Sequence, residues 1–447
     1  MIADLKPYPA LKPSGVPWLG EVPEHWEVAP GKRFIRSLPT GVAPIKNVAV
    51  GESSPGLVPS FSASGQDVWL PRACGSGSAL ILSAVGARSG RTFLAPSGEW
   101  GLVANTQAFR VGVSQDTRFW WYLVNTPQWW DREGSAQPYV RVAPTLSKKC
   151  AVPPSEEQRA IVRFLDWVDG RIGKAVGLKE REIALLEEQK QAIITEAVTR
   201  GLDKSVALKP SGVPWLGEVP EHWYVRRAKY LFHIVNQRSR SGREELLSVS
   251  ARRGVVLRST ASVSMFKAGS YIGHKLCWPG DLVINSLWAW AGGLGFSTDH
   301  GLVSTAYSVY RPNAEYVRYA NYWNALLRSR AYNWEFMTRS KGVWKSRLQL
   351  ADGVFMSMRI LVPPLDEQEA IVRFLNAETA RIDRVGDQLR REVELLGEYR
   401  TRLISDLVTG KLDVREAAKG LPEQPGDLEH SEADAGGQEP LEQAEAA

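Results

Sequence analysis

Two long stretches of the chain carry apolar residues at alternating spacings of three and four, and this pattern constrains the fold most. The first stretch covers residues 155–201 and follows Pro153-Pro154, where a helix cannot continue backwards. Ser155 with Gln158 is typical of a capping box at a helix start. The spacing predicts a coiled-coil helix. The expected seam residues are Ile161, Leu165, Ile172, Ile183, Leu186 and Ile193, with Lys179 and Lys190 as polar breaks.

The same stretch returns 210 residues later, after Val362-Pro363-Pro364. A helix of roughly 46 residues is about 69 Å long at 1.5 Å per residue, which is too long to bury its stripe within one small domain. We therefore expect each long helix to pack against the other. The second seam contains Ile371, Leu375, Ile382, Leu389, Leu396 and Leu403.

Sixteen residues, LKPSGVPWLGEVPEHW, occur twice without a change, at 11–26 and 208–223. We call this segment the His-Trp repeat. Its Pro and Gly residues predict turns, and its tryptophans predict apolar anchors. His25 and His222 lie in it without a second His, Cys or paired carboxylate at ligand spacing, so we expect both to be structural.

The repeats divide the chain into two copies of a variable segment followed by a long helix. Each variable segment has an apolar run (80–82, 282–284) that predicts a strand and an aromatic-rich run (117–126, 314–330) that predicts a helix. We expect an α+β fold with two related domains. The expected segments are 1–26 with the first His-Trp repeat, 27–152 as the first variable domain, 153–203 as the central helix, 204–223 with the second repeat, 224–361 as the second variable domain, 362–413 as the distal helix and 414–447 as an acidic, disordered tail.

Composition bounds the class of protein. The 447 residues are 44% apolar, which is typical of a globular chain. Cys74, Cys150 and Cys277 are scattered and odd in number, which favours a reducing compartment over a disulfide framework. The start of the chain has no signal pattern, and no run is long and apolar enough to span a membrane, so we expect a cytoplasmic protein.

The net charge of +6 conceals an asymmetry. Residues 421–447 contain eight acidic residues and no Lys or Arg. Residues 1–420 therefore carry 55 basic against 41 acidic residues, a net charge of +14. This basic body suggests a polyanionic partner such as nucleic acid.

Motifs for catalysis are absent from the sequence. Gly173-Lys174 is followed by Ala175 inside the predicted helix, so no G-x-x-x-x-G-K-[ST] phosphate loop occurs. Gly75-Ser76-Gly77 lacks the strand-turn-helix setting of a dinucleotide loop. No Asn-Pro-Pro-Tyr type motif of amino-methyltransferases and no His/Cys metal cluster occurs. The sequence therefore predicts a binding protein without catalytic residues and without a metal or cofactor of its own.

Basic and polar residues in expected loops, interleaved with aromatics, are the candidate binding residues. Arg and Lys can pair with guanine, Asn and Gln with adenine, and further positive charge can contact phosphates. Taken singly, each residue is more commonly a solvated surface charge; as a group they favour DNA reading. The candidates are Arg88, Ser89, Arg91, Asn105, Gln107 and Arg141 in the first variable domain, and Arg252, Arg253, Asn285, Ser286, Lys341, Trp344, Lys345 and Arg347 in the second.

Three motifs in a fixed order carry a resemblance to a known family. They are SGVPWLGEVPEHW before each variable domain, VPP-x-x-EQ-x-AIVRFL at the start of each long helix, and VTRGLD and VTGKLD at the helix ends. Over about residues 8–415 the chain resembles the specificity (S) subunits of type I restriction-modification systems.

The resemblance implies a function and a set of partners. Each variable domain would be a target recognition domain that reads one half of a bipartite, asymmetric sequence in double-stranded DNA. The long helices would form an antiparallel coiled coil that holds the domains apart with pseudo-two-fold symmetry and docks two methyltransferase (M) subunits. The complex would recruit restriction (R) subunits. S-adenosylmethionine, ATP and Mg²⁺ would belong to those partners, and the S subunit itself would not be an enzyme.

A second interpretation from another class stays open at this point. The chain could be a coiled-coil scaffold that joins two protein-binding domains, with an incidental excess of basic residues. Salt-dependent binding of duplex DNA distinguishes the two, because contacts to phosphates weaken steeply with salt.

Overall fold

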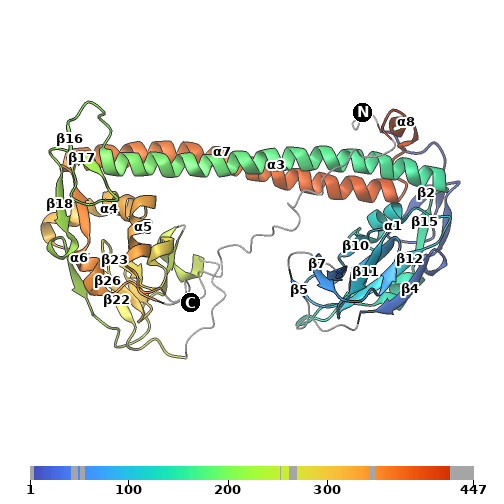
Figure 1. Ribbon diagram of the computed structural model, residues 1–447, viewed down its shortest axis with the longest axis horizontal. Coiled ribbons are helices and arrows are strands. Elements are labelled where there is room, and N and C mark those ends of the chain that lie inside the picture. The colour runs from blue at the N-terminus through green and yellow to red at the C-terminus, as the bar shows by residue number, and fades with distance from the viewer. Residues whose placement is uncertain are drawn as a thin grey trace. The chain divides into compact units, whose positions relative to one another are not determined.

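The computed structural model describes residues 5–41, 49–50, 56–251, 253–260, 269–342 and 348–422. The described chain forms two compact units, unit 1 with residues 5–179 and 391–422 and unit 2 with residues 180–390. The boundary falls inside both long helices, α3 (Ser155–Arg200) and α7 (Leu365–Val408) (Figure 1). The predicted segments 153–203 and 362–413 are thus helices that the two units share.

Unit 1 contains the first His-Trp repeat and the first variable domain. Its shorter helices are η2 (Gly31–Arg33), α1 (Thr117–Val124), α2 (Val142–Ser147) and α8 (Arg415–Ala418). Its strands are β1 (Leu11–Pro13), β2 (Glu21–Pro23), β3 (Glu27–Pro30), β4 (Ile35–Thr40), β5 (Ala49–Val50), β6 (Val58–Ser62), β7 (Gly65–Leu70), β8 (Gly75–Ser76), β9 (Ala79–Ser83), β10 (Thr92–Ala95), β11 (Glu99–Leu102), β12 (Thr106–Val111), β13 (Arg132–Glu133), β14 (Tyr139–Val140) and β15 (Lys149–Val152).

Unit 2 contains the second repeat and the second variable domain. Its shorter helices are η4 (Ala228–Tyr230), η5 (Arg258–Thr260), η6 (Ala289–Ala291), η7 (Ala314–Tyr319), α4 (Ala320–Leu327), α5 (Arg330–Arg339) and α6 (Asp352–Ser357). Its strands are β16 (Leu208–Pro210), β17 (Glu218–Pro220), β18 (Tyr224–Arg227), β19 (Phe232–Val235), β20 (Leu247–Ser250), β21 (Gly254–Leu257), β22 (Lys275–Cys277), β23 (Leu282–Asn285), β24 (Leu294–Phe296), β25 (Gly301–Val303), β26 (Tyr307–Pro312) and β27 (Arg359–Val362).

Both variable domains are built on a four-stranded antiparallel sheet of the same order. It runs β10-β9-β12-β4 in unit 1 and β24-β23-β26-β19 in unit 2. The predicted strands at 80–82 and 282–284 lie within β9 and β23, whose residues are all buried between neighbouring strands. An aromatic-rich helix follows in each unit, α1 after β12 and α4 after β26. The expected α+β class is confirmed.

A buried carboxylate joins the His-Trp repeat of unit 1 to the start of α3. The Glu157 side chain is 6% exposed and accepts hydrogen bonds from Tyr8 Oη (2.5 Å), His25 Nε2 (2.7 Å) and Trp26 Nε1 (2.8 Å). Burial, and then the hydrogen bond to Glu157, raise the pKa of Tyr8. We call this arrangement the carboxylate clamp. It gives His25 the structural role predicted for it.

Unit 2 repeats the clamp at the start of α7. There the Glu367 carboxylate accepts from Trp223 Nε1 (2.9 Å) and from His222 Nε2. The following glutamine is also used alike in both units, since the amides of Gln158 and Gln368 donate to the carbonyl oxygens of Pro153 (2.9 Å) and Pro363 (2.7 Å). The two motifs recur together because their side chains bind each other.

The predicted capping box at the start of α3 is wrong. The helix starts at Ser155 as expected, but its first turn closes on Pro154, whose carbonyl accepts from the Gln158 backbone amide. The Gln158 side-chain oxygen accepts instead from the backbone amide of Asp116, the residue before α1. Gln158 therefore ties α3 to the variable domain.

Each His-Trp repeat also contacts the end of the other long helix. Gly201 follows α3 and Gly410 ends the last turn after α7, with φ of +78° and +79°. A Cβ atom on Gly410 would lie 2.4 Å from Pro23, and one on Gly201 would lie 3.3 Å from the Trp223 ring. The left-handed backbone favours glycine at both positions, and at Gly410 the close approach to Pro23 also excludes a side chain. One repeat thus holds the start of one helix and the end of the other.

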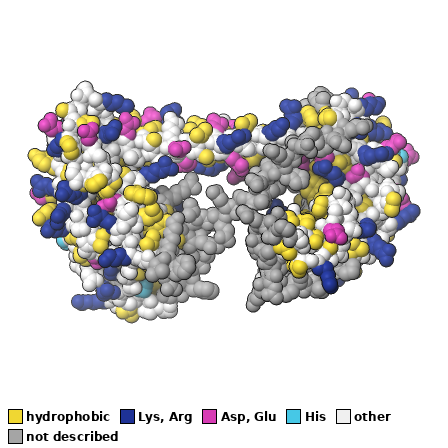
Figure 2. All heavy atoms as spheres, viewed as in Figure 1, with side chains coloured by type: hydrophobic (Ala, Val, Ile, Leu, Met, Phe, Trp, Pro, Cys, Tyr) yellow, Lys and Arg dark blue, Asp and Glu magenta, His cyan; other side chains and the backbone are white. Residues whose placement is uncertain are grey.

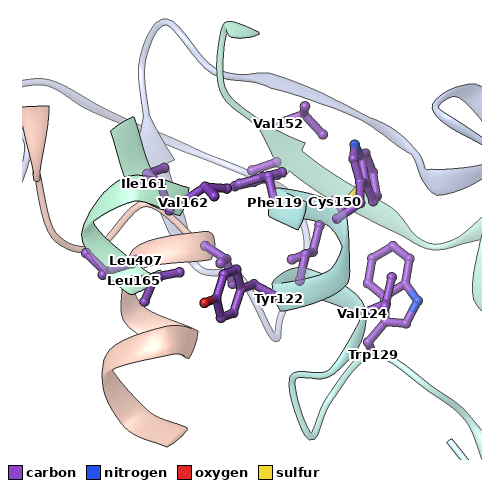
Figure 3. Close-up of a cluster of buried hydrophobic side chains, with 14 of the residues drawn as sticks. Phe119, Tyr122, Val124, Trp129, Cys150, Val152, Ile161, Val162, Leu165 and Leu407 are labelled. Carbon is purple, nitrogen blue, oxygen red and sulfur yellow. The ribbon is translucent and has the colours of Figure 1, made fainter. Parts of the chain in front are cut away.

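The apolar core of each unit merges the variable domain with both long helices. In unit 1, Ile161 and Leu165 of α3 and Leu407 of α7 pack with Phe119 and Tyr122 of α1 (Figure 3). In unit 2 the corresponding core includes Ala197 and Val198 of α3, Ile371 and Leu375 of α7, and Tyr322 and Trp323 of α4. The helix ends are therefore parts of the domain cores.

A buried ionic network reinforces this packing in unit 1. Tyr122 Oη donates to Asp166 (2.8 Å), which also accepts from Arg118 (2.8 Å), and Arg400 of α7 pairs in bidentate fashion with Asp169 at 2.9 Å. Burial raises the pKa of Asp166, against the opposing effect of Arg118 and of the Tyr122 hydrogen bond. Unit 2 uses neutral partners instead: Tyr322 Oη donates to the carbonyl of Val198 at 2.7 Å.

The predicted seam residues are all buried or half-buried, and α3 packs along α7 within each unit. Ion pairs within each unit join residues of increasing number on α3 to residues of decreasing number on α7. The paired segments of the two helices therefore run in opposite directions. The lysines predicted as polar breaks in the seam both find carboxylates on α7. The ion pairs are Asp169–Arg400 and Lys179–Glu392 in unit 1, and Glu187–Arg390 and Lys190–Asp383 in unit 2.

Residues 414–421, predicted as the start of a disordered tail, are folded. Val414, Ala418 and Leu421 are buried in the core of unit 1, and α8 lies between them. Arg415 pairs with Asp413 and covers the Tyr8 ring at 5.2 Å. The apolar residues at 414, 418 and 421 have the spacing of a helical turn. The prediction from sequence missed this turn because the residues that follow it are rich in acidic side chains. Residues 423–447 lie outside the described chain.

None of the helices in the described ranges is both long and apolar enough to cross a membrane.

We predict that Glu157→Ala destabilises unit 1 by about 2–3 kcal/mol, because buried donors of Tyr8 and Trp26 lose their acceptor. Glu156→Ala, an exposed neighbour in the same turn, is the matched control and should stay within about 0.5 kcal/mol. Urea unfolding monitored by hydrogen exchange at residues 5–30 measures both. Equal unfolding midpoints for the two variants would contradict the clamp.

Substitutions of two seam leucines can distinguish the contribution of helix pairing from the stability of the domain core. Leu389 lies in the seam of unit 2 but outside its domain core, whereas Leu403 belongs to the core of unit 1. We expect Leu389→Asp to raise hydrogen exchange along α7 only, and Leu403→Asp to raise it throughout unit 1, because each buries an unpaired charge. Identical exchange maps would show that the seam and the core are not separable.

Candidate nucleic-acid interface

Three segments of unit 1 meet at the turn that follows β9. The turn runs from Ala84 to Arg91 and contains Gly86 and Gly90 at φ of +102° and +90°. The amide of Ala84 donates to the carbonyl of Asn105 (2.8 Å), the amide of Val140 donates to Ala84 (2.8 Å), and that of Gly86 donates to Pro138 (2.7 Å). Backbone hydrogen bonds thus join the Gly-rich turn, the β11–β12 turn and the β13–β14 hairpin.

These segments carry a group of exposed arginines, which we call the arginine cluster: Arg88, Arg91, Arg132 and Arg141. The Arg91 guanidinium lies 5.8 Å from the Phe93 ring, and Arg88 donates to Ser64. Arg132 crosses the turn at Gly90, where an added Cβ would lie 2.7 Å from its Nε atom. Arg88 and Arg91 are thus held by neighbours that carry no charge, and Arg132 lies against the backbone at Gly90.

Glu133 is the carboxylate that pairs with this cluster among the described residues. It accepts from Arg141 at 2.8 Å and from Tyr139 Oη at 2.9 Å. The Tyr139 hydrogen bond, followed by that of Arg141, lowers the pKa of Glu133. Four guanidinium groups against one carboxylate leave a surplus of positive charge that suits a phosphate or the acceptor edge of guanine.

Asn105 lies beside the cluster as an exposed residue at the β11–β12 turn. Its φ of +71° is in the left-handed region, which asparagine tolerates better than most residues. Four of the predicted candidates, Arg88, Arg91, Asn105 and Arg141, therefore lie together. Arg132 is a member that the sequence reasoning missed, since nothing in the sequence links it to Gly90.

Two further candidates in unit 1 are not available at the surface in the same way. Ser89, predicted as a DNA-binding candidate, is 2% exposed in the turn at Gly86, so its hydroxyl does not lie at the surface. Gln107 is half-buried on β12 and its amide donates to Ser37 of β4. It links two strands of the sheet.

In unit 2 the candidates that follow β23 are buried. Asn285 and Ser286 are each 3% exposed. The Asn285 side chain accepts from the Leu287 amide (3.2 Å), and the Ser286 hydroxyl donates to the Ala306 carbonyl (3.0 Å). Both predicted DNA-binding candidates therefore bond backbone groups, of the turn for Asn285 and of Ala306 for Ser286, and do not lie at the surface.

The other candidates of unit 2 lie on turns. Arg253 is exposed between β20 and β21 and donates to the carbonyl of Thr260 at 2.8 Å. Lys341 is exposed, and its backbone pairs with Gln349. The remaining candidates, Arg252, Trp344, Lys345 and Arg347, lie outside the described residues.

Arg328 fixes the turn that carries Arg253. Its guanidinium donates to the carbonyls of Leu294 (2.9 Å) and Ala251 (2.7 Å), and Gly254 leaves room for it. Burial lowers the pKa of Arg328.

Sequence reasoning also missed the stacked rings of Trp288 and Trp290, with centroids 5.4 Å apart, next to the β23 turn. No group of three or more His, Cys, Asp or Glu side chains in the described ranges could hold a metal ion.

Comparisons with known proteins find relatives among type I restriction enzyme specificity subunits. No family model matches the chain. The type I restriction enzyme MjaVIII specificity subunit of Methanocaldococcus jannaschii is 23% identical over 303 residues, 63% of this chain and 66% of the relative. A putative MjaX specificity subunit of the same organism is 24% identical over 289 residues, 60% of each protein. The curated relatives of this chain are thus type I restriction enzyme specificity subunits. The chain spans less than two thirds of their lengths.

A solved structure shows the same fold over most of the chain. It comes from work on complex assembly and conformational transition of the type I restriction-modification system. The TM-score is 0.59 at 14% identity, and the match covers 88% of this chain and 99% of the other. These relatives confirm the resemblance to specificity subunits that the His-Trp repeats and helix starts carry.

We predict that Arg132→Ala weakens duplex DNA binding by about 1–3 kcal/mol if its guanidinium contacts a base, and less for a phosphate. Arg33→Ala is the control, because Arg33 in the same unit already pairs with Glu27 at 2.8 Å. Fluorescence anisotropy with a labelled duplex at constant salt measures the difference. Equal affinities of the two variants would exclude Arg132 from the interface.

Proposed function

We propose that the chain is the non-catalytic DNA-specificity subunit of a type I restriction-modification complex, in which each variable domain reads one half of a bipartite, asymmetric site. The observation that carries the proposal is a shared scaffold with unlike surfaces. Both units have the same His-Trp repeat, carboxylate clamp and four-stranded sheet. The turns after β9 and β23 differ, with exposed arginines in unit 1 and buried Asn285 and Ser286 in unit 2.

Unlike domains on a repeated scaffold suit a sequence that is not a palindrome. A homodimer presents the same surface to both half-sites and therefore reads a symmetric sequence. One chain with two different domains lacks that restriction. The arginine cluster of unit 1 and Arg253 and Lys341 of unit 2 are the exposed groups that would contact bases or phosphates.

The long helices would set the distance between half-sites as an antiparallel coiled coil. α3 has 46 residues, about 69 Å at 1.5 Å per residue. At 3.4 Å per base pair this limits the centres of the half-sites to about 20 base pairs apart, and about one helical turn would put both on one face of the duplex.

The partners follow from the proposed role. Two methyltransferase (M) subunits would dock on the chain, and restriction (R) subunits would join through the complex. S-adenosylmethionine, ATP and Mg²⁺ would be bound by those partners, because this sequence contains no motif that would hold them. The free thiols of Cys74, Cys150 and Cys277 support the expectation of a cytoplasmic location.

Single-molecule sequencing of genomic DNA tests the function. Cells with the chain and its methyltransferase partner should show a modified motif of two unlike half-sites with a fixed spacer, and cells without the chain should lack it. A modification pattern that does not depend on the chain would contradict the proposal. Duplex binding that ignores salt would favour the protein-binding scaffold instead.

We predict that a four-residue insertion within 175–189 of α3 changes the spacer length and leaves both half-sites intact. The insertion lengthens the helix by about 6 Å, close to two base pairs. The same four residues inserted within 203–206, in the loop after α3, serve as the control and should leave the spacer unchanged. An unchanged motif for the helix insertion would show that helix length does not set the spacing.

A further inference from the structure

The two units diverge directly after the identical His-Trp repeat, at positions that still correspond. β3 and η2 of unit 1 match β18 and η4 of unit 2 at the same shift of 197 residues, and β15 matches β27 as the paired strand. The backbone is therefore the same, and only the side chains differ. In order, Glu27 corresponds to Tyr224, Ala29 to Arg226, Pro30 to Arg227, Lys32 to Lys229, Arg33 to Tyr230 and Lys149 to Arg359.

In unit 2 this region has lost its acid and gained exposed cations. Unit 1 pairs Arg33 with Glu27, whereas unit 2 has tyrosines at both positions, 64% and 57% exposed. Arg226 covers the Tyr224 ring at 5.7 Å, and Lys229 covers the Tyr230 ring at 4.9 Å. Tyrosine faces attract these cations but leave their positive charge uncompensated.

A pair of like charges lies at the end of this two-stranded sheet. Arg227 of β18 is directly opposite Arg359 of β27 in the antiparallel register. Like charges in directly opposite positions destabilise a sheet. In the described part of the chain no carboxylate forms an ion pair with either residue, and none pairs with Arg226 or Lys229. Unit 1 avoids the repulsion, because Lys149 faces Pro30.

We propose that this region binds phosphates of duplex DNA and does not read bases. We call it the basic rim, made of Tyr224, Arg226, Arg227, Lys229, Tyr230 and Arg359. A phosphate between Arg227 and Arg359 would offset their repulsion, and guanidinium forks, ammonium groups and tyrosine hydroxyls are all phosphate donors. Figure 2 shows Lys and Arg side chains gathered at the left edge, over the β18 region.

The composition of the rim favours DNA over an acidic protein partner. The centres of protein interfaces are depleted of charge and rich in apolar contacts. The rim instead spreads four cations over β18, η4 and β27, with tyrosines as its exposed rings. It is also separate in sequence from Arg253 and Lys341, the exposed candidate residues of unit 2. The inference rests on the proposed DNA-specificity function and adds a sequence-independent contact to it.

The test is Arg227→Gln with Arg359→Gln in the full chain, alone and together with its methyltransferase subunits. Removing two phosphate contacts should reduce the slope of log affinity against log salt by about 1.8, so that the loss of affinity between 50 and 200 mM salt shrinks roughly tenfold. The ratio of affinities for cognate and unrelated duplexes should not change. The melting temperature should stay the same or rise, because the repulsion is removed.

A charge-reversal variant of the rim is compared with a matched charge-reversal control. In the rim, Arg226→Glu with Arg227→Glu should weaken binding of both duplexes alike, and more strongly than the two glutamine substitutions do. Lys204→Glu with Arg402→Glu makes the same change in net charge at cations that are 84% and 85% exposed and already paired with Glu196 and Asp406. This control should leave the salt slope within about 0.5 of the wild type.

The outcomes separate the inference from the function on which it rests. An unchanged salt slope in both rim variants, with wild-type binding intact, would overturn the basic rim alone. A changed ratio of cognate to unrelated affinity would overturn it too, because the rim would then read bases. Loss of methyltransferase assembly with DNA affinity retained would assign the rim to an acidic protein surface. Failure of the wild type to bind any duplex would overturn the proposed function as well.

Discussion

The carboxylate clamp is the interaction on which the rest of each unit depends. In the first turn of each long helix, a glutamate accepts hydrogen bonds from the His and Trp of a His-Trp repeat. Glu157 is buried and Glu367 is half-buried, and a carboxylate can be buried at low cost only when such donors surround it. The clamp joins the start of a helix to the repeat, and the repeat in turn packs against the glycine that ends the other helix. Three segments distant in the sequence are thereby held in one core.

The two units use this common frame with different chemistry around it. Unit 1 secures α1 through charged groups, the Asp166 and Asp169 network, whereas unit 2 secures α4 through Tyr322 and a backbone carbonyl. The exposed turns differ as well. In unit 1 they carry the arginine cluster, in which the Arg132 side chain crosses the Gly-rich turn at Gly90. Such divergence is what a scaffold tolerates when the contacts shared by its two units lie in the core and the side chains that differ lie on turns.

Sequence reasoning succeeded where a property repeats along the chain. The seams from Ile161 to Leu403, the strands at 80–82 and 282–284, and the structural role of His25 all follow from spacing or from duplication. It expected exposed side chains at Ser89, Asn285 and Ser286, which are buried; those of Asn285 and Ser286 satisfy backbone groups. It missed Arg132, whose place beside Gly90 depends on a hairpin that begins more than forty residues further along the chain.

The sequence alone therefore determined the two long helices, the twofold internal repeat and the resemblance to specificity subunits, because periodicity and repetition are carried by the order of the residues. Only the tertiary structure decided which loop residues are exposed, that the helix carboxylates bind the His-Trp repeats, and that the chain stays folded through Leu421. Those features depend on contacts between segments far apart in the chain, and such contacts leave no local pattern from which side-chain direction or burial can be read.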